Sequence, residues 1–232
     1  MPVITYEARE NVALVRMDDG KANAFGYAML DELDAALDRA EREAAAVVIA
    51  GRPGRFSAGF DLGEMMAGID KVRALVGRGT STFLRLYGLP MPLVAACTGH
   101  ALAAGAFTLL TADVRVAARG AFKIGLNEAT IGMPLPVLAV ELCRDRLAPA
   151  HLLSSTLFGQ IVDPERAVVA GWVDELADEA AVVDTAVARA ALLTKLPRPA
   201  YAQTKLALRE RMIAHVRQTL ELDLARLTAP TK

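Results

Sequence analysis

The chain alternates short apolar runs with amphipathic stretches of helical spacing. A strand-length run without polar positions is typical of a strand that is covered on both faces. Residues 27–44 place Leu30, Leu33 and Leu37 on one side and charged residues on the other, which predicts an amphipathic helix. The repeated order of strand, loop and helix predicts an α/β core with crossover connections. The segments expected as strands are 3–9, 12–17, 46–50, 93–96, 114–117 and 122–124.

The C-terminal part of the chain is helical in pattern. Its last helical segment is interrupted in its apolar register around residues 205–211. A long amphipathic segment of this kind commonly packs on a neighbouring subunit or folds back on the core. We therefore expect a core over residues 1–195 and a C-terminal helical region over residues 196–232. The expected helices are 137–147, 149–157, 164–170, 179–196 and 199–227, with a strand-like segment at 172–176.

A glycine-rich turn and a lone acid mark the middle of the chain. The turn after Thr98 runs into an apolar helix at 103–112, and the start of a helix offers free backbone N–H groups and positive potential. Glu128 is the only charged residue between Ile124 and Val140. A lone carboxylate is unfavourable to bury unless it is paired or neutralised. Together these features predict a site that stabilises an oxyanion and moves a proton beside it.

Three other polar residues have structural interpretations. Asp61 follows a glycine-rich loop, and Asp61 with Glu64 has the spacing of a capping box at the start of a short helix. Asp113 lies at a helix-to-strand junction and is expected to be a turn or cap residue. His100 follows a turn glycine and has no partner at a suitable spacing, so we expect a structural histidine.

Composition and charge exclude several classes of function. The 232 residues are 53% hydrophobic and 23% charged, which favours a packed protein over a disordered one. The net charge is -1 with acids and bases interspersed, so no basic surface for nucleic acid is indicated. Cys97 and Cys143 lack metal spacing and are expected as buried thiols, and no metal site is predicted. Residues 86–112 carry no charge, but Pro90 and Pro92 argue against a membrane span. The first residues do not resemble a signal peptide, so we expect a cytoplasmic protein.

Five segments match one known family in order and spacing. Each segment alone is weakly specific, whereas five in the same order are a strong match. They are KANAF at 21–25, GRFSAGFDL at 54–62, PMPLVAACTGHALAAG at 90–105, ADVRVAARGAFKIGLNEATIGM at 112–133 and GQIVDPERAVVAGWVDEL at 159–176. Over nearly its whole length the chain resembles the crotonase (enoyl-CoA hydratase/isomerase) superfamily. The resemblance implies an α/β spiral of strand–strand–helix repeats with a C-terminal helical region that helps to assemble trimers.

The resemblance also implies a set of site residues. Family members bind acyl-CoA thioesters and stabilise the thioester enolate with two backbone N–H groups, which fall on Phe60 and Ala104. The substrate carries its own CoA, so no cofactor is expected. The expected assembly is a homotrimer or a dimer of trimers. The residues that fall where the family holds CoA are Lys21, Ala22, Ala58, Asp61 and Leu62.

Two positions distinguish among the reactions of the family. Its hydratases use two glutamates, and the corresponding residues here are Phe107 and Glu128. Hydration needs a water that is oriented and deprotonated while a proton is delivered to C2, whereas moving a double bond from C3–C4 to C2–C3 needs a single base. The string IGLNE at 124–128 also resembles the Δ3,Δ2-enoyl-CoA isomerases more than the FGxPE string of hydratases. We therefore expect an enoyl-CoA isomerase with Glu128 as the base and Phe107 in the acyl pocket.

Several alternatives stay open. The chain could be an enoyl-CoA hydratase with a substituted first carboxylate, another crotonase-type enzyme that cleaves or decarboxylates a thioester, or a non-catalytic acyl-CoA-binding protein. Glu128 could also be an ordinary acid in the first turn of a helix, where the helix dipole favours it. Phe107 could be a plain core residue.

Overall fold

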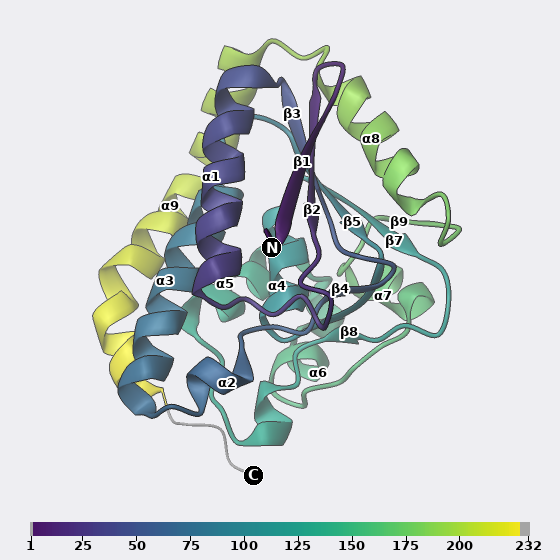
Figure 1. Cartoon of the computed structure of the whole chain (residues 1–232). Coiled ribbons are helices and arrows are strands. Elements are labelled where there is room, and N and C mark those ends of the chain that lie inside the picture. Colours follow the sequence, from purple (N-terminus) through teal and green to yellow (C-terminus); the bar gives the residue numbers. More distant parts are fainter. Residues whose placement is uncertain (1, 228–232) are drawn as a thin grey trace.

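A six-stranded sheet passes through the middle of the protein in the computed structural model, which describes residues 2–227 (Figure 1). β1 and β2 pair antiparallel, and the other neighbouring pairs are parallel. Every residue of β3 and β5 is buried, as their unbroken apolar sequence predicts. In spatial order the strands are β1 (Ile4–Arg9), β2 (Val12–Met17), β3 (Ala46–Ala50), β5 (Leu93–Cys97), β7 (Val114–Ala118) and β9 (Glu175–Ala177).

A smaller parallel sheet takes one strand from each turn of the chain. β4 (Gly54–Ser57), β6 (Gly99–Leu102) and β8 (Ile124–Gly125) follow β3, β5 and β7, and they pair in that order. Each pair of strands then leads into helices, which confirms the predicted spiral of strand–strand–helix repeats. Because parallel strands end at a common edge, the segments that follow β4, β6 and β8 come together at one end of this sheet.

Helices cover both faces of the six-stranded sheet. α8 (Val182–Leu193) packs on β2, β3, β5 and β7 from one side, whereas α1 (Tyr27–Glu43), α3 (Ile69–Tyr87) and α4 (Ala104–Thr111) belong to the larger core on the other side (Figure 1). Among residues 2–227, no helix is long and apolar enough to cross a membrane. The remaining helices are α2 (Leu62–Met65), η1 (Glu128–Ile131), α5 (Val137–Arg146), η2 (Pro149–His151), α6 (Leu152–Thr156), α7 (Pro164–Ala170) and α9 (Arg198–Arg226).

The C-terminal region is one helix that folds back on the core. α9 runs without a break and packs on α3 and α5, which confirms the helix predicted over residues 199–227. The apolar register is lost because Lys205 and Arg209, one turn apart, face inward and are each 6% exposed. Both side chains bind one carboxylate. Lys205 Nζ lies 2.8 Å from Asp113 Oδ2, and an Arg209 guanidinium nitrogen lies 3.0 Å from Asp113 Oδ1.

Asp113 therefore does more than the predicted turn or cap residue. Besides binding the two cations, its Oδ2 accepts a hydrogen bond from the backbone N–H of Leu93 at 2.7 Å. Burial lowers the pKa of Lys205 to about 8, even though the nearby Asp113 carboxylate raises it. The carboxylate thus joins the end of α4, the start of β5 and the C-terminal helix.

Removal of this carboxylate should destabilise the fold. Asp113→Ala leaves two buried cations without an opposite charge, and breaking a buried pair in this way typically costs about 3–5 kcal/mol. Urea denaturation should therefore show a loss of several kcal/mol in the free energy of unfolding. The control is Glu43→Ala, which removes the exposed Arg39–Glu43 pair and should change that free energy by less than about 1 kcal/mol. Equal losses in the two variants would contradict the assignment.

Candidate active site

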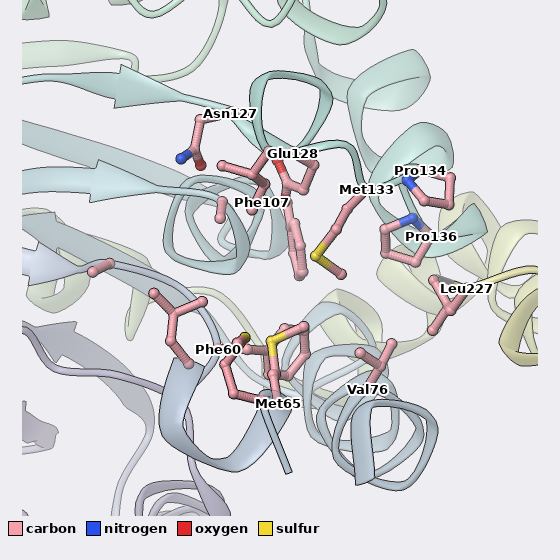
Figure 2. Close-up of a pocket in the computed structure, with 15 residues that line it drawn as sticks. Phe60, Met65, Val76, Phe107, Asn127, Glu128, Met133, Pro134, Pro136 and Leu227 are labelled. Carbon is pink, nitrogen blue, oxygen red and sulfur yellow. The ribbon is translucent and has the colours of Figure 1, made fainter. Parts of the chain in front are cut away.

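A cavity of about 290 Å³ lies among the segments that follow β4, β6 and β8. Apolar side chains form most of its wall, and Glu128 is the one titratable group among the lining residues (Figure 2). The cavity therefore offers an apolar chamber with a single candidate acid or base. Its lining residues are Ala58, Phe60, Leu62, Met65, Met66, Val76, Ala103, Phe107, Asn127, Glu128, Ile131, Met133, Pro134, Pro136 and Leu227.

The turn after β4 presents the backbone N–H of Phe60. The neighbouring peptides are tied to Phe25, whose N–H donates to Gly59 O at 2.8 Å and whose carbonyl accepts from Asp61 N at 3.3 Å. Phe25 and Phe60 form a parallel bridge, in which Phe25 is bonded to the residues before and after Phe60. The N–H of Phe60 itself therefore points away from Phe25. Within residues 2–227 the Phe60 N–H has no acceptor, and the residue lines the cavity. It is therefore a free donor on a residue that lines the cavity.

The turn after β6 supplies a second free N–H. Ala104 is the first residue of α4, so its amide has no acceptor within the helix, and it donates to no other group in the described chain. The preceding Ala103 has φ 50° and ψ -127°, a conformation that residues with a side chain rarely adopt. A Cβ placed on Gly59 would lie 3.2 Å from Ala104 N, so the two turns are in contact. The free amides of Phe60 and Ala104 therefore belong to touching turns.

Glu128 begins η1 and is 7% exposed. Its Oε2 atom is buried and has no hydrogen-bond partner among the described residues. Burial raises the pKa of this carboxyl to about 7, and hydrogen bonding from the backbone of Glu128 and Asn127 opposes the shift only in part. Figure 2 shows the side chain at the cavity. A carboxyl with this pKa can take up and release a proton near neutral pH.

Phe107 lies both in the core and on the cavity wall, as the sequence predicts. It is 1% exposed and belongs to an aromatic cluster centred on Phe83 of α3. The Phe83 ring makes edge contacts with Phe107 and with Phe25, each at 5.1 Å between ring centroids, and it contacts Phe60 at 5.9 Å. An apolar ring therefore occupies this part of the cavity wall.

Comparison with known proteins identifies the family of this chain. The family model described as enoyl-CoA hydratase/isomerase matches residues 7–232. The chain belongs to this family. A probable enoyl-CoA hydratase of Rhodobacter capsulatus is 32% identical over 207 residues, which cover 88% of this chain and 80% of the relative.

Solved structures agree with this membership in the crotonase superfamily. An enoyl-CoA hydratase/isomerase family protein from Pseudomonas syringae has a TM-score of 0.95 and 35% identity, covering 97% of this chain and 98% of its own. An enoyl-CoA isomerase from Mycobacterium tuberculosis has a TM-score of 0.92 and 37% identity, covering 97% of this chain and 99% of its own. The predicted crotonase fold is confirmed, and the relatives carry the names of both activities.

In this crotonase-family chain, the residues predicted to hold CoA lie along two neighbouring loops. Ala58 and Leu62 line the cavity. The carbonyl of Ala22 accepts a hydrogen bond from Ala58 N at 3.0 Å, which holds the loop of Lys21 and Ala22 beside the turn after β4. Lys21 is exposed, whereas Asp61 is half-buried at the start of α2. The structure thus holds the loop of Lys21 and Ala22 next to the turn that carries Ala58, and this turn continues through Phe60 to Asp61 and Leu62.

Asp61 and Glu64 form only half of the predicted capping box. Asp61 Oδ1 accepts from Glu64 N at 3.0 Å. The Glu64 carboxylate reaches a different helix, because its Oε1 accepts from Tyr27 N at the start of α1 at 3.4 Å. Gly26 leaves the space for this contact, since a Cβ there would lie 2.7 Å from Glu64 Oε1. Glu64 therefore joins α2 to α1 rather than closing its own helix.

Of two further polar residues, His100 was interpreted from the sequence and Asn127 was not. His100 is structural, as expected, and its Nδ1 accepts from the backbone N–H of Lys123 at 3.0 Å across the smaller sheet. Asn127 was missed, although it lines the cavity and its buried Oδ1 has no partner among residues 2–227. Its position next to Glu128 was the one available signal.

Sequence reasoning also missed most of the apolar wall. Met65, Val76, Met133 and Leu227 lie far apart in the sequence and meet at the cavity. Their spacing is that of ordinary core residues, so no local pattern separates a cavity wall from a packed interior. Figure 2 shows Val76, Pro136 and Leu227 gathered at the end of the cavity away from Asn127.

Replacing the buried acid should stabilise the protein at high pH. Folding raises the pKa of Glu128 from 4.5 to about 7, so its contribution to stability is complete below about pH 4.5 and is lost as the pH rises through about 7. Above this window the wild type carries a desolvated charge, whereas glutamine stays neutral. Glu128→Gln should then be more stable than the wild type by on the order of 3 kcal/mol in urea denaturation. The difference should shrink toward pH 4.5; a difference independent of pH would show that folding does not shift this group.

Proposed function

We propose that the protein is an enoyl-CoA isomerase that moves the double bond of an enoyl-CoA from C3–C4 to C2–C3. The observation that carries the proposal is that Glu128 is the single titratable side chain among the 15 residues that line the cavity. One base suffices for this shift, since the proton removed from one carbon is returned to another. Hydration needs an oriented water and a second group to move its proton, and Phe107 supports neither task.

Glu128 acts on two carbons in turn. Its carboxylate takes a proton from C2, and the electron pair of the broken C–H bond moves into a C1–C2 double bond while the thioester oxygen becomes an enolate. The N–H groups of Phe60 and Ala104 donate to that oxygen, and loss of one such donor typically lowers kcat by about 10²–10³-fold. Glu128 then delivers the proton to C4. The electrons return from the oxygen, the double bond is left at C2–C3, and the carboxylate is regenerated.

The apolar wall supports this chemistry in two ways. Burial keeps the pKa of Glu128 at about 7, so the same group serves as a base and as an acid near neutral pH. An apolar chamber also excludes the water that would add to the conjugated product. The unpartnered Oε2 of Glu128 is the atom we assign to the proton transfer.

We assign the two ends of the substrate to the two ends of the site. The CoA moiety is proposed to lie along Ala58 and Leu62 at the cavity and on the loop of Lys21 and Ala22, with Asp61 at its edge. The acyl chain is proposed to pass Phe107 toward the far end of the cavity. Three apolar residues lie at that end, namely Val76, Pro136 and Leu227 (Figure 2).

We also propose that the chain assembles as a homotrimer or a dimer of trimers. The region of α6 exposes three large apolar side chains, Leu153 at 57%, Leu157 at 69% and Phe158 at 71%. Apolar side chains that gather on a surface commonly mark a subunit contact.

The second candidate is an enoyl-CoA hydratase, a name that the Rhodobacter capsulatus relative carries. A protein that binds acyl-CoA without turnover is the third. Both candidates use the same cavity and the same free amides. They differ from the isomerase in the reaction at Glu128, which is addition of water in the hydratase and no reaction in the binding protein.

Two assays should separate the candidates. The wild type should isomerise 3-hexenoyl-CoA and hydrate crotonyl-CoA poorly. Glu128→Gln keeps the shape of the side chain but removes the base, so it should lower the isomerisation rate by roughly 10²–10⁴-fold. Coupled spectrophotometric assays with each substrate make the measurement. Efficient hydration without isomerisation would favour the hydratase, binding without either reaction would favour the binding protein, and a fully active Glu128→Gln would mean that another group is the base.

The pH profile should report the buried carboxyl. Because the base acts as a carboxylate, kcat/KM for isomerisation should rise with pH through about 7 and then level off. The residual activity of Glu128→Gln should lack this step and serves as the control. A step near the ordinary carboxyl value of 4.5 would contradict a desolvated base.

A further inference from the structure

Gly79 holds a place in α3 that an ordinary helical residue would fill. It is buried in the middle of the helix, where glycine costs roughly 0.5–1 kcal/mol relative to alanine. A Cβ on Gly79 would lie 2.4 Å from Cε1 and 2.6 Å from Cζ of the Phe60 ring. Contacts this short do not occur, so alanine at position 79 requires the Phe60 ring to move. The ring thus occupies the space that the missing side chain leaves.

The Phe60 ring has neighbours that limit where it can go. It contacts Phe83, which lies one turn along α3 from Gly79, at 5.9 Å between ring centroids. Phe83 is itself held by edge contacts with Phe25 and Phe107. A phenylalanine side chain has only two rotatable bonds, so a ring that leaves its place in α3 must change its rotamer, shift the Phe60 backbone, or do both.

The same cluster reaches both turns that carry the free amides. Phe25 forms the hydrogen bonds on either side of Phe60, and Phe107 lies in the first turn of α4, which begins at Ala104. α3 therefore touches the turn of Phe60 and the helix of Ala104 through one group of rings. The ring that enters α3 and the N–H that faces away from Phe25 belong to the same residue, Phe60.

We propose that Gly79 is a positioning residue of the oxyanion hole, which admits the Phe60 ring into α3 and thereby sets the Phe60 N–H against the Ala104 N–H. The inference rests on the proposed function only in its assumption that these amides bind a thioester oxygen. It applies equally to isomerisation, to hydration and to binding of the thioester alone.

Gly79→Ala should impair turnover more than binding. A displacement of about 1 Å in a catalytic group can lower the rate by about 10²-fold, so kcat should fall by roughly 10–100-fold while KM changes little. The matched control is Gly77→Ala in the same helix, where the added Cβ would meet a flexible side-chain end, Leu224 Cδ1, at 3.3 Å. Both substitutions raise helix propensity, and Gly77→Ala should keep its kcat.

A second substitution should reverse the effect. Phe60→Leu shortens the side chain and leaves the backbone N–H in place. The kcat of Gly79→Ala/Phe60→Leu should therefore be close to the kcat of Phe60→Leu alone, so that most of the loss caused by Gly79→Ala is recovered. Thermal unfolding of each variant identifies one that merely fails to fold. If Gly79→Ala alone does not fold, a folded and active double variant still shows that the clash is with the ring. A folded double variant that stays as impaired as Gly79→Ala would overturn the proposal.

A spectroscopic probe tests the amides without relying on the reaction. A bound 2,4-hexadienoyl-CoA absorbs at longer wavelength when its carbonyl oxygen accepts hydrogen bonds. The wild type and Gly77→Ala should show this shift, and Gly79→Ala should bind the probe with a smaller one. The proposal would be overturned if Gly79→Ala kept the absorption shift and the kcat of the wild type, whether or not its KM rose. If the wild type shows the shift but has no isomerase activity, the proposed function is wrong and this inference stands. If the wild type binds the probe without any shift, both the proposed function and this inference are wrong.

Discussion

Direct contact between two main-chain turns is the constraint on which the candidate active site depends. A Cβ on Gly59 would lie 2.8 Å from Ala103 Cβ, and a Cβ on Gly105 would lie 2.3 Å from the Ser57 carbonyl oxygen. Any side chain at these glycines would separate the turn after β4 from α4. Two amides on different turns can converge on one oxygen only if the turns touch. The parallel pairing of β4 with β6 and the aromatic cluster on α3 both serve to keep that contact.

The apolar wall places a second demand on the fold, because it acts on Glu128 through the loss of water. The same burial that brings the pKa of its carboxyl to about 7 leaves one of its oxygens without a partner. A partner for that oxygen would stabilise the folded state, and it would also occupy the atom to which we assign the proton transfer in the proposed reaction. The unpartnered oxygen therefore lowers the stability of the folded state and leaves the carboxyl group available for chemistry, a combination that is common in active sites.

α9 connects the stability of the fold to the shape of the cavity. Near its start, Lys205 and Arg209 bind Asp113 behind α4. Near its end, the Asp223 carboxylate accepts from Val137 N at 2.8 Å, and Leu227, which follows the helix, lines the cavity. The helix is thus held by charged side chains at two places along its length, and Leu227, the residue that follows it, forms part of the cavity wall. The division at residue 195 stays a prediction, and the apolar face of α9 joins the same core as α3 and α5.

Local signals were enough to predict the strands of the six-stranded sheet, the glycine-rich turns and the isolation of Glu128, because each depends on residues that lie close together in the chain. The spiral followed from the family match, and β4 and β6 were expected as a loop and a turn. The match to a known family then placed Phe60 and Ala104 by position. Only the tertiary structure revealed why Lys205 and Arg209 interrupt the apolar pattern of the last helix, since their acceptor, Asp113, is about ninety residues away. For the same reason the space that Gly79 leaves for Phe60 and the place of Leu227 in the cavity wall could not be predicted. These are contacts between distant segments, and no period or motif in one segment records what the other will place against it.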